Sequence, residues 1–249
     1  MIQAHSPLGL AAHVRARSCE GQVILLDLRS NRYIGVGPTA SAVLSQSVKG
    51  WPSVRSDIDD SDLAPNSQRP IDVGALTQRF LSEGLLDRSA LQRPAEESLV
   101  MADASLDFED LAMPIETGAR HAARFLKAAA LSALRLRYQS LEAIARGVSA
   151  RRRRRQAGRE SPSTASLVSM RTSAIVYERL RPFLVTSHRR CLFDSLTLLE
   201  FLAGEGLFPH WVIGVKTRPF GAHSWVQYES TVLNDQHAHV RQFLPILIA

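Results

Sequence analysis

The sequence contains little cysteine and no long apolar run. Cys19 and Cys191 are its two cysteines in 249 residues and lie far apart, which excludes a disulfide framework and suits a reducing compartment such as the cytoplasm. No stretch approaches the ~18 consecutive apolar residues that a membrane span needs. Residues 1–10 lack the charged start and apolar centre of a signal peptide. We therefore expect a cytoplasmic protein without a membrane span.

Positive charge is concentrated in one segment. The formal net charge is +6, and the five consecutive arginines at residues 151–155 match almost all of that excess. Aromatic side chains that could stack on bases do not alternate with this run, so we expect no nucleic-acid partner. Gly158, Pro162 and several serines surround it. This composition predicts an arginine-rich surface loop over residues 149–166.

Strand and helix patterns alternate over residues 1–92. Strand patterns over residues 14–18, 23–28 and 32–36, separated by turn residues, predict a three-stranded meander. Helix patterns follow from Thr39 and over residues 72–83, with a loop over residues 49–69 between them. We expect an α+β chain with a winged-helix-like domain over residues 1–92, a linker near residues 93–96, and a second domain over residues 93–249.

A helical pattern begins the second domain, and we predict helical structure over residues 100–148. One stripe of this pattern comprises Leu126, Ala130, Leu134, Tyr138, Leu141 and Ala145, and the opposite face carries Arg124, Lys127, Arg135 and Arg146. Alanine is frequent in the stripe and aromatic side chains are few. The stripe is therefore predicted to pack on a core rather than to bind a membrane surface.

The candidate catalytic residues lie in the last part of the chain, residues 167–249. A helix pattern that begins at Cys191 is followed by strand patterns over residues 211–215 and 223–228. The start of a helix favours a nucleophilic cysteine, because its partial positive charge and free amides stabilise the thiolate. His223 is the candidate base, and Asp235 is the candidate group that orients it. Two adjacent antiparallel strands would hold these two residues beside the cysteine helix.

Other roles for nearby residues remain open. Asn234 could orient the histidine in place of Asp235, and His188 could act as the base. Asp194 is expected to be a favourable carboxylate at a helix start, and Cys19 a structural residue. The histidines that could join Cys191 in a zinc site are His188, His210, His237 and His239. No metal-binding spacing supports such a site, so we predict neither a metal nor another cofactor.

The order of cysteine helix, histidine strand and aspartate resembles that of the transglutaminase-like, papain-like cysteine peptidases. The segments CL at residues 191–192, GAHSWV at residues 221–226 and ND at residues 234–235 are similar to those of the lasso peptide leader peptidases in this superfamily. Residues 1–92, with DL at residues 27–28, Tyr33 and GPTA at residues 37–40, resemble the PqqD-like element that binds leader peptides. The whole chain is thus similar to the fused B proteins of lasso peptide biosynthesis, although the arginine run has no counterpart there.

This resemblance implies a leader peptidase. Such an enzyme binds the leader of a lasso precursor peptide and cleaves it from the core by Cys191–His223–Asp235 thiol catalysis. An asparagine-synthetase-like cyclase then uses ATP to close the macrolactam. The alternatives are a non-catalytic peptide-binding module and another transglutaminase-like amidase or acyltransferase.

The resemblance also implies that the leader adds as a strand to the edge of the meander, beside a helix. The candidate leader-binding residues are Arg32, Tyr33, Ile34, Val36, Val73, Leu76 and Phe80.

Overall fold

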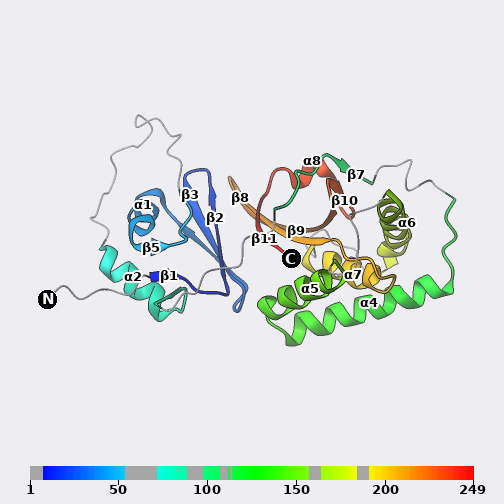
Figure 1. Cartoon of the computed structure of the whole chain (residues 1–249), viewed down its shortest axis with the longest axis horizontal. Coiled ribbons are helices and arrows are strands. Elements are labelled where there is room, and N and C mark those ends of the chain that lie inside the picture. The colour runs from blue at the N-terminus through cyan, green and yellow to red at the C-terminus, as the bar shows by residue number, and fades with distance from the viewer. Residues whose placement is uncertain are drawn as a thin grey trace. The chain divides into compact units, whose positions relative to one another are not determined.

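The structure of the chain, a computed structural model, describes residues 8–53, 72–88, 98–106, 112, 114–156, 164–183 and 191–249. Its internal contacts divide the chain into two compact units, residues 1–96 and 97–249. Both units mix helices and strands, in agreement with the predicted α+β class (Figure 1). Within the described ranges, no helix is both long and apolar enough to cross a membrane. The predicted linker at residues 93–96 lies outside the described residues.

A three-stranded antiparallel meander forms the main sheet of the first unit. Its strands are β2 (Val14–Cys19), β3 (Gln22–Asp27) and β4 (Arg32–Val36), in the order β2-β3-β4. The turns between them contain positive φ angles at Glu20, Gly21 and Asn31, which fit tight hairpin turns. The predicted meander is confirmed, and β4 is an edge strand of its sheet.

Two helices and a second small sheet complete the first unit. The helices are α1 (Pro38–Ser47) and α2 (Val73–Ser82), and the second sheet has the order β5 (Val48–Lys49), β1 (Leu8–Leu10), β6 (Leu86–Asp87). Sequence reasoning missed this sheet because strands of two or three residues are too short for a readable alternation. Most of the predicted loop over residues 49–69 lies outside the described residues.

The core of the first unit joins the meander to both helices. Leu25 of β3, Leu44 of α1 and Phe80 of α2 are buried in one cluster. Trp51 packs parallel to Phe80, with 6.5 Å between the ring centroids. The helices are therefore held to the sheet by burial of apolar surface, the main favourable term in folding.

A five-stranded sheet organises the second unit. In the order β11-β8-β9-β10-β7, its strands are β11 (Leu244–Ile248), β8 (His210–Thr217), β9 (Phe220–Tyr228), β10 (Thr231–Val232) and β7 (Ala104–Ser105). Neighbouring strands are antiparallel except for β10 and β7. The sequence predicted β8 and β9. The segment 100–148, predicted to be helical, begins instead with extended chain that contains β7.

Helix α7 is the central helix of this unit. The helices are α4 (Ala119–Tyr138), α5 (Leu141–Gln156), α6 (Thr164–Leu180), the 3-10 helix η2 (Arg181–Phe183), α7 (Cys191–Ala203) and α8 (His237–Val240). α7 contacts α4, α6, β8 and β9, and α4 runs along it in Figure 1. Because Leu196, Leu198 and Phe201 are buried, α7 is a core helix whose position is closely determined.

The face of α4 that packs on the core differs from the predicted one. Leu126, Leu134 and Tyr138 of the predicted stripe are exposed, whereas the buried residues of this helix are Phe125, Ala128, Ala129 and Ser132. The helix also ends at Tyr138, before α5. Arg124 and Arg135, assigned to the solvent face, form ion pairs with Glu205 and Glu200. The sequence pattern was misleading because the arginines on the face of α4 that packs on the core are paired with glutamates. From sequence alone, this face therefore resembled a solvent-exposed one.

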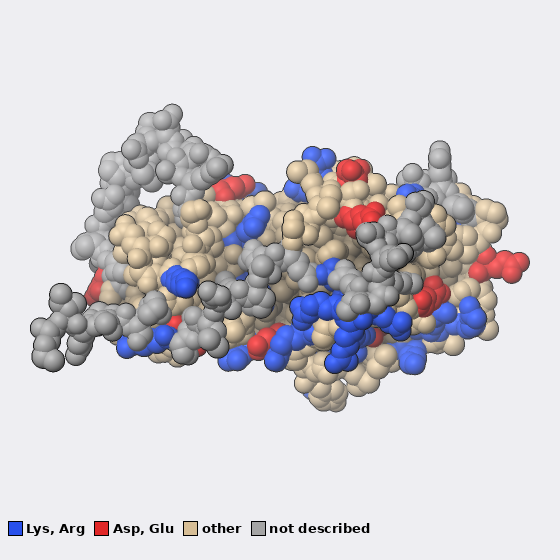
Figure 2. All heavy atoms as spheres, in the orientation of Figure 1, with Lys and Arg blue, Asp and Glu red and all other residues tan. Residues whose placement is uncertain are grey.

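The arginine run is helical rather than a loop. Residues 151–155 lie in the last turns of α5, and the rest of the predicted loop up to residue 163 lies outside the described residues. Arginine is a good helix former, and Arg151 pairs with Glu200, which offsets repulsion within the run. Arg152 is buried, whereas Arg153, Arg154 and Arg155 are exposed. Figure 2 shows Lys and Arg side chains gathered over the region of α4 and α5.

Candidate active site

Cys191 is the first residue of α7, as the sequence predicted. Its side chain is partly buried, so the thiol is sheltered by protein but keeps access to a reactant. The amide groups of Leu192 and Ser224 hydrogen-bond to the sulfur and stabilise its charged form. Residues 184–190 lie outside the described residues, and with them the alternative base His188 and the cations Arg189 and Arg190.

His223 lies inside β9 rather than at its start. It pairs in register with Gly214 of β8, and its ring is stacked on Trp225 with 6.1 Å between centroids. The ring of Phe243 lies 5.3 Å away, centroid to centroid. A Cβ atom at Gly214 would come within 2.8 Å of both Trp225 and Phe243. Gly214 therefore permits the aromatic packing that holds the imidazole, a role the sequence did not reveal.

Asp235 approaches His223 from a bend after β10, not from a strand as predicted. His223 Nε2 donates to Asp235 Oδ2 over 2.6 Å, which leaves Nδ1 as the ring nitrogen available to the thiol. Asp235 Oδ1 accepts from the amide of Gln236 at 2.7 Å, and Oδ2 also lies 3.0 Å from His239 Nδ1. These bonds fix the orientation of the carboxylate.

The three groups shift one another's pKa values. Burial raises the pKa of the Cys191 thiol, but hydrogen bonding and charge attraction to His223 outweigh burial, so this pKa lies below its ordinary value. Burial lowers the pKa of His223, but its bonds to Asp235 and Cys191 raise it to about 9. Despite burial, the bonds from His223 and His239 lower the pKa of Asp235 to about 2. The lowered pKa of Cys191 and the raised pKa of His223 both act in favour of a thiolate beside an imidazolium.

Asn234 faces away from the histidine, unlike the alternative considered from sequence. Its side-chain oxygen accepts from the amide of Val226 at 2.9 Å, and its nitrogen donates to Asp194 Oδ2 at 3.0 Å. Asp235 is therefore the residue of this pair that contacts His223. Asp194, expected as a simple helix-start carboxylate, is 2% exposed and belongs to a buried hydrogen-bond network that sequence reasoning missed.

Three of the site's polar side chains could also hold a metal ion. His223, Asp235 and His239 each offer one ligand atom, and these atoms lie within 4.8 Å of one another. They already hydrogen-bond to one another around Asp235 Oδ2. Among the histidines of the alternative zinc site, His210 contacts Arg152 and His237 contacts Ser105. His239 instead bonds to Asp235, and His188 lies outside the described residues.

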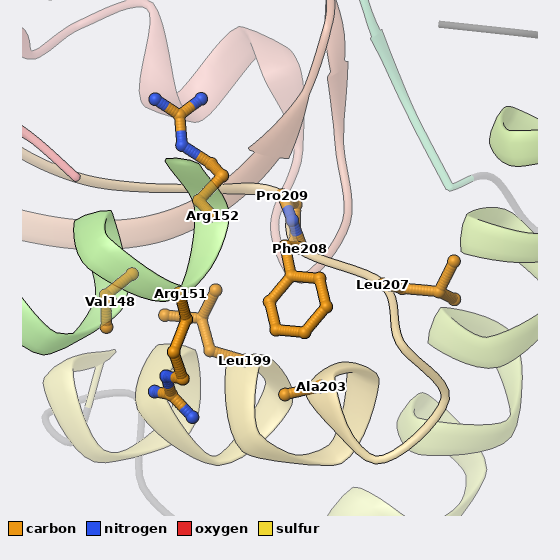
Figure 3. A pocket seen from close by; sticks show the side chains of 8 residues that line it. All are labelled: Val148, Arg151, Arg152, Leu199, Ala203, Leu207, Phe208 and Pro209. Carbon is orange, nitrogen blue, oxygen red and sulfur yellow. The ribbon is translucent and has the colours of Figure 1, made fainter. Parts of the chain in front are cut away.

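A small hollow lies at the opposite end of α7 from Cys191 (Figure 3). It is lined by Val148, Arg151, Arg152, Leu199, Ala203, Leu207, Phe208 and Pro209. Figure 3 shows Arg151 and Arg152 pointing in opposite directions from α5. Arg151 reaches Glu200 on α7, and Arg152 contacts His210 of β8. The hollow contains none of the candidate catalytic residues.

The candidate leader-binding residues lie on β4 and α2 of the first unit. Those on β4 are Arg32, Tyr33, Ile34 and Val36, and those on α2 are Val73, Leu76 and Phe80. Val36 and Phe80 are buried in the core, so they can shape a surface groove only from beneath. Ile34 and Leu76 are half-buried against the same core. The side chain of Val73 lies outside the described residues.

The other two candidates on β4, Arg32 and Tyr33, differ in exposure. Arg32 is exposed and its guanidinium lies 2.9 Å from the carboxylate of Glu83, the C-cap of α2. Tyr33 is half-buried. The Arg32–Glu83 ion pair links the edge strand to the end of the neighbouring helix.

Comparison with known proteins agrees with this geometry. Residues 128–248 match the transglutaminase-like superfamily, and the match includes Cys191, His223 and Asp235. This part of the second unit is therefore a transglutaminase-like domain. The chain is also 44% identical to the microcin J25-processing protein McjB of Escherichia coli over 45 residues, which are 18% of this chain and 22% of McjB.

The aligned part thus spans about a fifth of the length of this relative. The two partial matches agree with the resemblance of the chain to the B proteins of lasso peptide biosynthesis. The first unit lies outside the superfamily match. No solved structure matches the chain.

Proposed function

We propose that this chain is a leader peptidase of lasso peptide biosynthesis, with Cys191 as nucleophile, His223 as acid and base, and Asp235 as the orienting group. The observation that carries the proposal is the bonded pair of His223 and Asp235 beside a cysteine of lowered pKa at a helix start. The partial match to McjB, by name a microcin-processing protein, supports the substrate class.

The proposed reaction follows ordinary thiol chemistry. The Cys191 thiolate attacks the carbonyl carbon of the bond between leader and core, and the His223 imidazolium protonates the departing amine. This step leaves the leader as a thioester on the sulfur and releases the core with a free N-terminus. His223 then removes a proton from water, which attacks the thioester and frees the leader. Asp235 holds the ring and stabilises its positive charge throughout.

The first unit is proposed to bind the leader. An extended peptide can add as a strand to the edge of a sheet, and β4 is an edge strand of the meander among the described residues. The exposed Arg32 and the half-buried Tyr33 lie on this strand, whereas the buried Val36 and Phe80 support the surface from within. An ATP-dependent, asparagine-synthetase-like cyclase is the proposed partner that closes the macrolactam on the released core.

Mass spectrometry of a lasso precursor peptide tests the proposal. The precursor is incubated with the unaltered protein, with Cys191→Ala, and with Cys19→Ala as a matched control, each with and without a lasso cyclase and ATP. We expect the leader to be lost with the unaltered protein and with Cys19→Ala but not with Cys191→Ala. Cys19 is a suitable control because it lies in the first unit, buried in β2.

Two other outcomes would point to the alternative functions. Leader binding without cleavage in every sample, even with the cyclase, would indicate a peptide-binding module. Cys191-dependent transfer of an acyl group to an added amine, without hydrolysis, would indicate a transglutaminase-like acyltransferase. Equal cleavage by Cys191→Ala would falsify the assignment of the nucleophile.

A further inference from the structure

Two polar side chains lie in the apolar helix α7 immediately after the cysteine. Asp194 is 2% exposed and Ser195 is fully buried, three and four residues after Cys191. Burying a carboxyl group is costly unless every oxygen is well bonded. A carboxyl group whose only role was to complement the helix start would gain the same interaction from a solvated position.

Ser195 bonds to the residue that follows His223 in the chain, and Asp194 bonds to the residue that precedes Asp235. The hydroxyl oxygens of Ser195 and Ser224 lie 2.7 Å apart, and Ser224 follows His223 in β9. Asp194 Oδ2 accepts from Asn234 Nδ2 at 3.0 Å, and Asn234 precedes Asp235. One turn of α7 is thus joined both to the strand of the histidine and to the bend of the aspartate.

The remaining bonds of Asp194 hold it rigidly. Its Oδ1 accepts from the Tyr177 hydroxyl at 2.8 Å and lies 3.0 Å from Arg181 Nε, so the carboxyl group has partners from α6 and η2. Glu178 also interacts electrostatically with Asp194. Arg181 forms an ion pair with each of these two carboxyl groups. On the far side, Asn234 is held by the amide of Val226. Both side chains that link the cysteine helix to the Asp235 bend, Asp194 and Asn234, are therefore held by further hydrogen bonds.

We propose that Asp194 is a positioning residue for the thiol reaction, which holds Asp235 in place against the cysteine helix through Asn234. This inference rests on the proposed function. Asp194 acts on His223 through the bend that carries Asn234 and Asp235, not by direct contact. If that bend shifts, the 2.6 Å bond from His223 to Asp235 weakens, the imidazolium is less stable, and the thiolate loses its partner.

Asp194→Asn tests the link with little change in volume. Its amide has one acceptor oxygen in place of two, so its N–H groups would face the donor on Asn234 or the donor on Arg181, and one of these bonds would be lost. Thr197→Val is the matched control, because Thr197 is a buried residue of the same helix. Its hydroxyl donates locally, to the carbonyl of Phe193 at 2.7 Å.

The measurement is the rate of Cys191 alkylation by iodoacetamide as a function of pH, with Cys19→Ala as the background and thermal unfolding recorded in parallel. We expect Asp194→Asn to raise the pH midpoint of alkylation by about half a unit or more. Cleavage of a precursor should fall by about tenfold or more. Thr197→Val should lose stability yet keep the original midpoint. A merely structural role for Asp194 would make the two variants alike.

Two further variants keep the test decisive. In the double variant Asp194→Asn/Asn234→Asp, donor and acceptor are exchanged, and we expect partial return of the midpoint. If Asp194→Asn does not fold, Asn234→Ala breaks the same link while Asp194 keeps Tyr177 and Arg181, and should raise the midpoint likewise. An unchanged midpoint in a folded variant overturns the inference. An ordinary thiol midpoint in the unaltered protein instead overturns the proposed function itself.

Discussion

A partly buried histidine lies near each end of α7, and the pKa values of the two histidines are shifted in opposite directions. At the cysteine end, the acidic partner Asp235 and the thiol raise the pKa of His223 to about 9. At the arginine end, burial and the nearby Arg152 lower the pKa of His210 to about 4. At neutral pH one histidine is therefore charged and the other neutral.

This difference shows that burial alone does not define a reactive site. Both histidines are partly buried in the same unit, on the adjacent strands β8 and β9. A neighbouring acid outweighs burial and keeps His223 protonated at neutral pH, whereas burial together with a neighbouring cation prevents His210 from taking up a second proton. The arginine end also pairs its charges internally, with Arg135 and Arg151 on Glu200. We infer that this end has a structural role.

The largest expected effect separates the two histidines directly. His223→Gln should reduce precursor cleavage by about 10⁴- to 10⁶-fold, the range seen when one triad member is removed. It should also return the pH midpoint of Cys191 alkylation toward that of an ordinary thiol. His210→Gln should leave that midpoint unchanged. Equal effects of the two variants on alkylation would contradict the distinction between the two ends of α7.

A smaller effect is expected from the acidic partner at the arginine end. The Glu200 side chain is 6% exposed and pairs with two arginines, so Glu200→Gln should destabilise the protein by about 2–4 kcal/mol. Urea unfolding measures this loss. Cys191 alkylation, scaled to the folded fraction, should not change. A changed midpoint would show that the arginine end influences the cysteine end after all.

The smallest effects concern stability against pH, and the two histidines should act in opposite directions. Because the pKa of folded His210 is about 4, below its ordinary 6.5, its contribution to stability is full above pH 6.5 and is lost as pH falls through about 4. The contribution of His223 is full below pH 6.5 and is lost as pH rises through about 9.

Unfolding free energies across this pH range check the prediction. In the unaltered protein, the titration of His210 should lower the unfolding free energy by at most about 3 kcal/mol as pH falls from 6.5 to about 4, and His210→Gln should remove this change. His223→Gln should remove the corresponding fall in unfolding free energy between pH 6.5 and about 9. If both variants removed the pH dependence of stability in the same pH range, the assignment of opposite pKa shifts to the two histidines would be wrong.

Local patterns predicted the elements that contain the candidate catalytic residues. The start of α7 at Cys191, the strands β8 and β9, and the meander of β2, β3 and β4 were all readable, because periodicity and turn residues act within a short segment. The same patterns led to the pairing of His223 with Asp235, although Asp235 proved to lie in a bend.

The tertiary structure decided which side chains became partners. Glu205 and Glu200 turned the arginine face of α4 inward, and Asn234, Tyr177 and Arg181 made it possible to bury Asp194. The ionisation of His223 and His210 likewise depends on groups distant in sequence. A local pattern records only the spacing of residues along one segment, whereas the free energy of a buried charge depends on every group that the fold brings beside it.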